Sequence, residues 1–341
     1  MNKSWSATAG QNLVSTQWRG GNCLRQIFQG ETIANGEVSV HSKVLGLEFL
    51  RPLVDDMVQA EPSKRPQSTS RDRFETIVGE LSTWKLRSRV AKEQDHPLHS
   101  LYLATVHWLR RVGFVIAHPP RRTFDMTGSG DAERELWDEE KWWIARRPWL
   151  ASLGYKLRPR YQPGWKPSWY GTNRLRLTAE DGYAPFSRGV LDATRLSDGT
   201  VVMMKRVPKS ISPGEVELTV MLNSPPQLSD PRNHCVPLYD VLQVPDDDDI
   251  QIMVLPLLRG HANPPFDTVG EAIHCFRQVI QCVQFLHENK IAHRDIHVLN
   301  IMMDASPLST VPFHPTRQNM RRDFKGHWRP SYTRTERPVK Y

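Results

Sequence analysis

The hydrophobic pattern predicts one long amphipathic helix in the C-terminal third of the chain. Apolar residues recur at spacings of three and four between Thr268 and Glu288, which is the period of a helix with one buried face. These positions are Val269, Ile273, Phe276, Val279, Ile280, Val283 and Leu286. We therefore expect a helix over this range that packs on one side against a core.

Strand patterns precede this helix. The runs Val190–Leu196 and Val201–Val207 flank an Asp-Gly turn at residues 197–200, which predicts a β-hairpin. A short helix is expected to begin at Glu215, and the apolar run Ile250–Leu258 predicts a further strand after a solvated four-aspartate turn. A sheet followed by a long helix indicates an α+β fold.

The N-terminal half of the chain carries weaker patterns. Residues 1–40 are polar and lack periodicity, so we expect them to be largely disordered. Apolar residues at helical spacing predict four further helices, over 47–60, 71–81, 98–114 and 133–153. The Pro- and Trp-rich stretch that follows, 157–170, is expected to be extended, and the tryptophans before it are expected to pack in a core.

Composition narrows the class of protein. The chain has neither an apolar run near 18 residues nor the apolar region of a signal peptide, so we do not expect a membrane partner. Its four cysteines, Cys23, Cys235, Cys275 and Cys282, lack metal-type spacing and favour a reducing intracellular compartment, cytoplasmic or nuclear. The formal charge of +8 permits a nucleic-acid-binding protein as a minor hypothesis. Because the basic residues are dispersed and no nucleic-acid motif accompanies them, we do not expect that partner.

The most specific chemical signal follows the long helix. The segment I-A-H-R-D-I-H-V-L-N places Asp295 five residues before Asn300, directly after His293 and Arg294. A carboxylate can accept a hydroxyl proton and an amide oxygen can hold a magnesium ion, which are the two groups that a phosphoryl-transfer loop needs. This spacing predicts a catalytic loop.

The helix and loop together, L-H-x-x-x-I-x-H-R-D, resemble the eukaryotic-type protein kinases. Two further segments, D-P-R-N-H-C-V-P at 230–237 and N-I-M-M-D-A-S-P at 300–307, are similar to a fungal group of these kinases. The resemblance implies a protein-kinase-like fold with a β-rich N-lobe and a partial helical C-lobe. It also implies ATP and Mg2+ as cofactors, and a protein substrate that the sequence does not identify.

The resemblance assigns roles within the loop. Asp295 would accept the substrate proton, Arg294 would brace the loop, and Asn300 would hold magnesium. His293 completes the motif. His297 stands where most kinases carry a lysine that contacts the γ-phosphate, and a neutral imidazole brings little charge there.

The resemblance also implies a nucleotide site in the strand region. Lys205 would bind the α- and β-phosphates, and a glutamate of the following helix would orient it. Between the two candidates we prefer Glu217 over Glu215, because Glu217 has Met221 one turn later. Leu255 would be the gatekeeper and residues 256–258 the hinge. The implied cofactor-binding residues are Val190, Lys205, Glu217, Leu255 and Leu257.

Two departures from the kinase pattern weaken the predicted activity. Before Val190 only Gly182 and Gly189 stand in place of a G-x-G-x-x-G loop. No D-F-G follows Asn300, since Lys325 interrupts the partial match Asp323-Phe324. We therefore expect a kinase-like chain truncated before that segment and impaired in catalysis. The alternative is a non-catalytic, pseudokinase-type interaction module.

The order of the segments is unusual for this family. We expect a disordered N-terminus (1–40), a helical segment resembling the end of a kinase C-lobe (41–118), a linker with a Trp-rich helix (119–170), a partial kinase domain (171–310) and a basic Pro-rich tail (311–341). A displaced C-lobe segment would arise if the tail of one kinase unit were joined to the head of another, in a tandem array or a mis-spliced gene. A permuted single domain is the competing interpretation.

Overall fold

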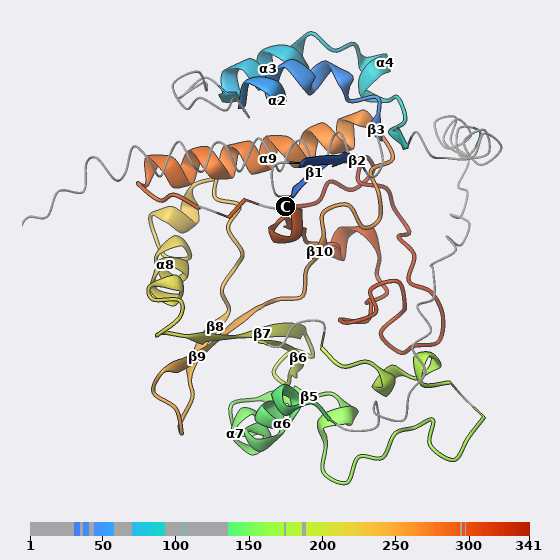
Figure 1. The fold of residues 1–341 in the computed structure, drawn as a ribbon, viewed down its shortest axis with the longest axis vertical. Helices are drawn as coiled ribbons and strands as arrows, with labels where there is room; N and C mark the ends of the chain where they lie inside the picture. The colour runs from blue at the N-terminus through green and yellow to red at the C-terminus, as the bar shows by residue number, and fades with distance from the viewer. Residues whose placement is uncertain are drawn as a thin grey trace, which may run out of the picture.

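The computed structural model describes residues 31–34, 37–40, 44–57, 70–92, 105, 136–173, 175–185, 189–293, 295–296 and 298–341. Its elements lie in successive layers along the long axis (Figure 1). The helices α2 (Arg51–Met57), α3 (Ser70–Gly79) and α4 (Thr83–Leu86) lie at one end, above α9 (Val269–Glu288). A β-sheet lies beyond α9, and α6 (Asp138–Ala145) and α7 (Arg147–Ser152) cover its far side.

The sheet has five antiparallel strands in the order β5-β6-β7-β9-β8. They are β5 (Tyr155–Leu157), β6 (Val190–Arg195), β7 (Val201–Pro208), β8 (Asp240–Gln243) and β9 (Ile250–Pro256). The helix α8 (Glu215–Leu222) lies between β7 and β8 in the chain. The sheet and the helices confirm the α+β class at the level of architecture.

The two faces of the sheet pack against different partners. Alternate residues of β6, β7 and β9 form one core with Trp143 of α6 and Leu150 of α7; they are Leu191, Ala193, Val202, Met204, Ile252 and Val254. On the other face, Val207 and Met253 pack with Val216 of α8. Successive side chains of a strand point to opposite faces, so the sequence pattern fixes which residues look toward α9.

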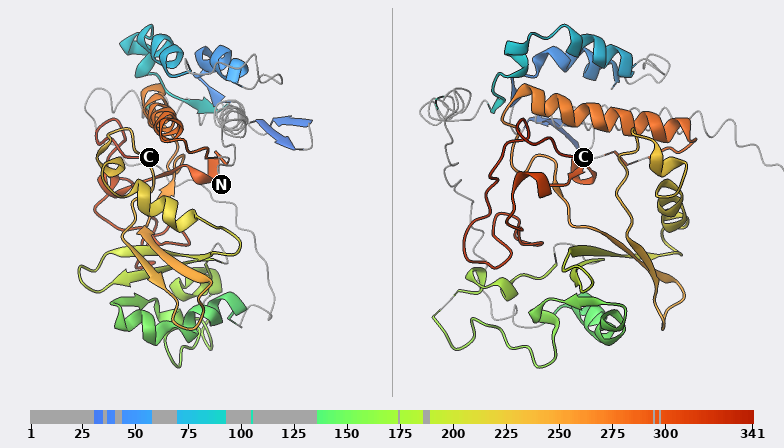
Figure 2. Two further views of the ribbon diagram at one scale, coloured as in Figure 1. Left: turned by 90° about the vertical axis from the view of Figure 1, so that its left-hand side faces the viewer. Right: turned by 180° about the vertical axis from the view of Figure 1, so that it is seen from behind.

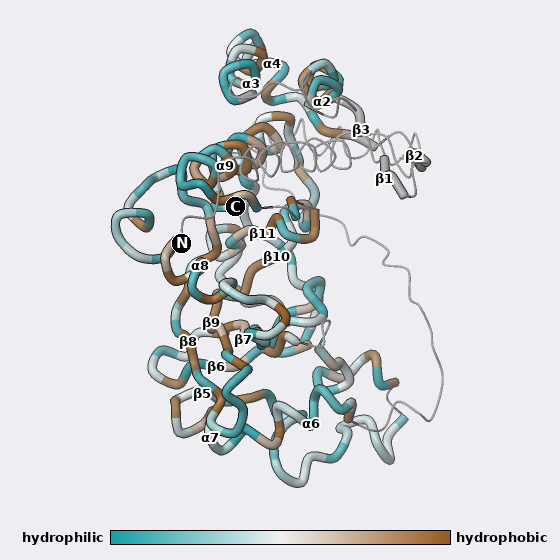
Figure 3. The backbone as a smooth tube through the Cα atoms, turned by 60° about the vertical axis from the view of Figure 1, so that its left-hand side comes forward, coloured by the Kyte–Doolittle hydropathy of each residue, from teal (hydrophilic) through white to brown (hydrophobic). Residues whose placement is uncertain are grey.

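Residues of α9 take part in the core of the N-terminal helices, in the core of the predicted loop and in the core beside the end of α8. Thr268 caps the N-terminus of α9, since the side-chain oxygen of Thr268 accepts a hydrogen bond from the Glu271 backbone N–H. The predicted helix over 268–288 is therefore confirmed to within one residue. Figure 3 shows hydrophobic stretches along α9 and along β9.

The N-terminal helices share a core with α9. Leu53, Phe74 and Val78 pack with Ile273 and Phe276 of α9, and the Arg277 guanidinium binds Glu75 of α3 in a bidentate ion pair at 2.8 and 2.9 Å. A short 3-10 helix, η1 (Glu48–Leu50), precedes α2. Part of the segment expected to resemble a C-lobe end thus contacts the same helix that leads into the predicted loop (Figure 2).

Two short strands connect the sheet to the C-terminal segment. β10 (Arg259–Gly260) follows β9 after two residues and pairs with β11 (Met302–Met303). Residues 304–341 then pack against this pair, with Met303, Leu308, Phe313 and Trp328 in one small core. The basic tail is therefore a folded part of the molecule.

Three elements differ from the sequence expectations. Residues expected to be disordered form a hairpin of β1 (Glu31–Ala34) and β2 (Glu37–Val40). The sequence has an Asn-Gly pair between these two runs, which is typical of a hairpin. The helix predicted over 133–153 is two helices divided at Arg146, because Pro148 lacks the amide hydrogen that a continuous helix needs. The edge strand β5 lies in the range expected to be a linker.

Other expectations fall outside the described residues. The stop signal at Glu61-Pro62 belongs to this group, and so does the helix predicted over 98–114 apart from residue 105. A second pair of short strands, β3 (Val44–Leu45) and β4 (Ala91–Lys92), joins the two ends of the N-terminal helical segment. Within the described residues, no helix has the length and apolar character required to cross a membrane.

Candidate functional site

The predicted nucleotide-binding residues lie on one face of the sheet. Val190 of β6 is directly opposite Lys205 of β7, and Lys205 is opposite Met253 of β9. Met203 is opposite Leu255 in the same register. Residues that are directly opposite in an antiparallel pair share a face, so Val190, Lys205 and Leu255 all look away from α6 and α7. The structure thus brings these three residues together.

Lys205 forms an ion pair with Glu215, the first residue of α8. Both side chains are partly exposed, at 41% for Lys205 and 32% for Glu215. The expected partner, Glu217, is exposed and lies on the outer side of the helix. The preference for Glu217 is therefore corrected, because Val216 and Leu222 form the buried side of α8 and place Glu215 next to β7.

The helical period explains why Lys205 pairs with Glu215 and not with Glu217. Residues four apart on a helix lie on one face, and residues two apart do not. Thr219, one turn after Glu215, is half-buried and its hydroxyl donates to the Glu215 carbonyl oxygen at 2.7 Å. Met221, which guided the expectation, is 38% exposed. An apolar residue one turn later does not identify the glutamate that faces Lys205, since α8 is apolar on several sides.

The predicted loop begins where α9 ends. The chain reverses through Lys290, whose φ of 63° is left-handed, and the Ile291 backbone N–H donates to the Leu286 carbonyl oxygen at 2.8 Å. Ile296 and Ile301 are buried against Cys275 of α9. These anchors hold the loop from both of its ends, on the same helix that carries the N-terminal segment.

Asp295 and Asn300 are in direct contact. The Asn300 side-chain Nδ2 donates to the Asp295 Oδ2 and to the Asp295 backbone oxygen, both at 2.9 Å. Both residues are exposed. Because the Asn300 Nδ2 donates its hydrogen bonds to Asp295, the Asn300 Oδ1 is the amide atom suited to a cation. The pair thus offers oxygen atoms from two side chains, as a magnesium ion bound together with phosphates requires.

Of the other predicted loop residues, the structure describes His293. The Asp295 backbone N–H donates to the His293 Nδ1 at 3.3 Å, and burial lowers the pKa of His293 against the opposing effect of Asp295. A neutral imidazole at this position orients the loop backbone. Arg294 and His297 lie outside the described residues, so their roles stay predictions.

The predicted hinge links the sheet to β10 and the C-terminal segment. β9 ends at Pro256, and Leu257 and Leu258 lead directly into β10. Leu257 packs against the core of the C-terminal segment. The Leu258 carbonyl oxygen accepts a hydrogen bond from the Gln318 side chain at 3.3 Å. One of the backbone groups expected to read adenine therefore already has a partner from residues 304–341.

The connection between β5 and β6 replaces the expected glycine-rich loop with a longer segment. It contains the 3-10 helices η4 (Pro159–Tyr161), η5 (Arg176–Thr178) and η6 (Glu180–Gly182). A Cβ atom at Gly182 would lie 2.2 Å from the Arg176 carbonyl oxygen. Local backbone packing therefore explains this glycine, without an approach to phosphate.

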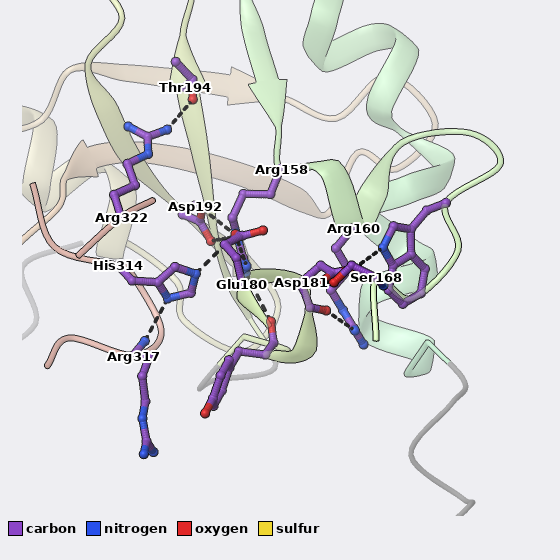
Figure 4. A network of polar contacts seen from close by, with 12 residues as sticks. Arg158, Arg160, Ser168, Glu180, Asp181, Asp192, Thr194, His314, Arg317 and Arg322 are labelled. Atoms are coloured by element: carbon purple, nitrogen blue, oxygen red, sulfur yellow. Dashed lines mark hydrogen bonds and ion pairs between the residues drawn. The ribbon is translucent and has the colours of Figure 1, made fainter. Parts of the chain in front are cut away.

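A buried polar network joins this connection to β6 and the C-terminal segment (Figure 4). Arg158 binds Asp192 of β6 through its Nε, 2.9 Å from Oδ2, and binds Glu180 at 3.2 Å. His314, which is fully buried, contacts the same Glu180 oxygen at 3.2 Å. Arg322 donates to the Thr194 hydroxyl at 2.7 Å. Asp192 and Thr194 lie on the same sheet face as Val190, so residues 314–322 lie against that face.

This network was not predicted from the sequence. It joins residues 158–194 to residues 314–322, which are more than 100 residues away in the sequence, and none of its members belongs to a local motif. Asp323 and Phe324 belong to the same C-terminal segment. The Asp323 carboxylate accepts from the Lys325 backbone N–H and pairs with Arg321, and the Phe324 ring packs against Tyr183 and His314. The partial D-F-G match therefore makes a turn of the tail.

Comparison with known proteins points to the protein kinases. The chain is 36% identical over 76 residues to the serine/threonine-protein kinase CAK1 of Saccharomyces cerevisiae, covering 22% of this chain and 19% of that protein. It is 26% identical over 135 residues to the NUAK family SNF1-like kinase 2 of Homo sapiens and of Pongo abelii, covering 35% of this chain and 19% of each relative.

The extent of these matches is limited. The chain spans about a fifth of the length of the curated relatives it matches. No family model matches the chain, and no solved structure matches it. Over about a third of its length, the chain is thus similar to protein kinases and shows a kinase-like relationship to them.

Proposed function

We propose that the chain carries out ATP-dependent phosphoryl transfer to a hydroxyl group of a protein substrate. The observation that carries this proposal is the ion pair of Lys205 with Glu215, on the sheet face that also presents Val190 and Leu255. A lysine held by a carboxylate keeps its ammonium group at a fixed place, which is what recognition of a triphosphate needs. The partial similarity to protein kinases supports the same assignment.

The adenine ring would lie between the sheet and the residues after β9. Val190 and Leu255 supply apolar contacts from β6 and β9, and the backbone at Leu257 and Leu258 supplies hydrogen-bonding groups. Ligand sites commonly combine such an apolar lining with a few placed polar groups. Lys205 would then face the α- and β-phosphates.

The loop residues fit a magnesium ion bound together with the nucleotide. Asn300 Oδ1 would be the oxygen donor from this loop, and magnesium in phosphoryl-transfer sites is held by one or two such side chains with the phosphates completing its shell. When bound, the ion neutralises negative charge on the phosphate oxygens. Asp295, oriented by Asn300, would accept the proton of the attacking hydroxyl.

We expect transfer to be slow. His297 brings little positive charge to the position where most kinases carry lysine. Phosphoryl transfer depends almost entirely on positioning and charge neutralisation. Each tenfold loss of rate corresponds to about 1.4 kcal/mol of barrier, so weaker charge neutralisation at the γ-phosphate slows the reaction.

A kinase assay on the full chain tests this proposal. Incorporation of phosphate from labelled ATP into a generic protein acceptor is measured for the wild type and for Asp295→Asn. We expect at least a 100-fold lower rate for the variant, in the range that a general base contributes. Asp304→Asn is the matched control, since Asp304 is also exposed and its carboxylate accepts a local turn hydrogen bond from the Ser306 backbone N–H. Equal incorporation by wild type and Asp295→Asn would remove Asp295 from the mechanism.

A second candidate is a non-catalytic, kinase-like interaction module. Two observations favour it: the Gln318 side chain donates to the Leu258 carbonyl oxygen, and Leu257 packs against the C-terminal segment. Thermal unfolding in the presence of Mg-ATP separates the two candidates. Ligand at about 100 times Kd stabilises a protein by about 2.7 kcal/mol, whereas a module that does not bind nucleotide shows no shift.

A further inference from the structure

Two thiols are in contact where the segment after α8 meets α9. The sulfur atoms of Cys235 and Cys282 are 3.9 Å apart. Cys235 lies in the loop between α8 and β8, and Cys282 lies on α9. Both residues are half-buried, at the edge of a core formed by Leu222, Phe285 and Leu286. The sulfur atoms are within van der Waals contact and are not bonded, since a disulfide is about 2.05 Å long.

Several independent contacts hold the loop in this position. The Cys235 backbone N–H donates to the Asn233 Oδ1 at 3.0 Å, and the Asn233 side chain donates to the Leu222 carbonyl oxygen at 2.8 Å. Arg232 binds Asp230 in the loop and Glu288 at the end of α9, at 2.7 and 2.6 Å. The two thiols therefore face one another through a fixed arrangement of loop and helix.

The chemistry of the pair is asymmetric. With Cys235 as donor, its S–H lowers the pKa of the Cys282 thiol. A hydrogen bond from the His234 backbone N–H also lowers this pKa, whereas burial raises it. The same bond, together with burial, raises the pKa of Cys235. Because the thiolate is the nucleophilic form of cysteine, Cys282 is the sulfur that attacks an electrophile first. Cys235 is the neighbouring thiol that can then attack the oxidised Cys282.

We propose that Cys235 and Cys282 form a redox-responsive pair that a peroxide converts into a disulfide across the contact between the α8–β8 loop and α9. The Cys282 sulfur attacks one peroxide oxygen, the O–O bond breaks, and water leaves, so that Cys282 becomes a sulfenic acid. The Cys235 sulfur then attacks the Cys282 sulfur, and the hydroxyl group leaves as a second water. Hydrogen peroxide is thereby reduced, and the two thiols are oxidised.

The disulfide would tie α8 to the helix that leads into the loop. Leu222, the last residue of α8, already packs against Phe285 and Leu286 of α9, and Ile291, at the start of the loop, contacts the same core. A covalent bond there would fix the distance between the two helices. If the proposed function holds, the bond would also fix Glu215, at the other end of α8, relative to the loop.

The test is peptide mapping of the full chain after oxidation. Reduced protein is treated with an equimolar amount of hydrogen peroxide, the remaining thiols are alkylated, and the digest is analysed by mass spectrometry. We expect a linked pair of peptides containing Cys235 and Cys282, lighter by two hydrogens than their sum and separated again by dithiothreitol. Alkylated Cys235 and Cys282 after treatment, or sulfinic acids without a link, would overturn the proposal.

Matched variants sharpen this result. Cys275 lies on the same helix but is fully buried, so Cys275→Ser should leave the link unchanged, whereas Cys235→Ser should abolish it. A chain carrying both Cys23→Ser and Cys275→Ser retains only the proposed pair and should lose both titratable thiols on oxidation. Its melting temperature should rise by a few degrees, since the bond closes a long loop. An unchanged melting temperature after complete thiol loss would contradict a bond between α9 and the loop. None of these readouts depends on nucleotide binding.

Discussion

Lys205 on β7 and Glu215 at the start of α8 form an ion pair that connects the sheet to its neighbouring helix. The pair lies on the sheet face opposite the core of α6 and α7. Both side chains are partly exposed, so their attraction adds little to stability, about 0.2–1 kcal/mol for such pairs. The main effect of the ion pair is therefore to hold the Lys205 ammonium group in place.

Replacement of each of the two glutamates on α8 by glutamine, in separate variants, tests this relationship. Glu215→Gln removes the charge beside Lys205, and we expect the stabilisation by Mg-ATP to fall by at least half. Glu217→Gln is the matched control, because Glu217 belongs to the same helix but is exposed. Thermal unfolding of each variant with and without Mg-ATP gives the answer. A larger effect at Glu217 would show that the ion pair does not serve the nucleotide.

The regular elements were readable from the sequence because their patterns are local. The β6–β7 hairpin has an Asp-Gly turn between two apolar runs, and α9 has a cap and a complete apolar stripe. The edge strand β5 was missed, since its three residues, Tyr155–Leu157, are too few to show a period. Only the pairing with a neighbouring strand shows that these three residues form part of the sheet.

Site residues were predictable where a motif fixed their spacing. The contact of Asp295 with Asn300 follows from a spacing of five on one short loop. The choice between Glu215 and Glu217 depended on which side of α8 is buried, and that is decided by packing against β7 and β9. The approach of Arg322 to Thr194 joins segments 128 residues apart, which no local pattern encodes.

Loss of Asp192 should destabilise the chain strongly. Asp192 and Arg158 are both buried, with 3% and 7% of their side chains exposed. Removal of Asp192 leaves the buried Arg158 charge only partly compensated, by Glu180 at 3.2 Å. We expect Asp192→Ala to lower the free energy of unfolding by about 3 kcal/mol or more, as measured by urea denaturation. The joint change Arg158→Met with Asp192→Leu should recover much of this loss.

An exposed ion pair provides the comparison for Asp192. Arg146 binds Asp246 at 2.6 Å, but the Asp246 side chain is 60% exposed. We expect Asp246→Ala to cost about 0–1 kcal/mol. Similar losses for Asp192→Ala and Asp246→Ala would mean that the network around Arg158 is accessible to water.

Arg259 should anchor the C-terminal segment. Its guanidinium lies 4.5 Å from the Phe313 ring and 4.0 Å from the Trp328 ring, and it donates to the carbonyl oxygens of Asn263 and Gln318. We expect Arg259→Ala to cost about 3–5 kcal/mol, since it leaves a gap between two aromatic rings and two unpaired carbonyl groups. Urea denaturation measures the loss. Lys325→Ala, at an exposed site on the same segment, should stay within about 0.5 kcal/mol.

His261 should make stability depend on pH. Burial, together with Arg334, lowers the pKa of His261 from 6.5, against a hydrogen bond to the Ile301 carbonyl oxygen. Above about pH 6.5 the imidazole is neutral in the folded and the unfolded chain, so its full contribution is present. As the pH falls below this value, the unfolded chain binds the proton first, and stability is lost until the folded-state pKa is passed.

His261→Gln should therefore flatten the pH profile of stability. We expect the decrease in unfolding free energy between pH 7.5 and pH 5.5, set here as about one unit on each side of the ordinary histidine pKa, to be smaller in this variant than in the wild type. Other histidines contribute in the same direction, because burial lowers the pKa of each; they are His234, His274, His287 and His293. A residual slope is thus expected. His327→Gln, at an exposed site, is the control, and an equal flattening by both variants would show that burial of His261 is not the cause.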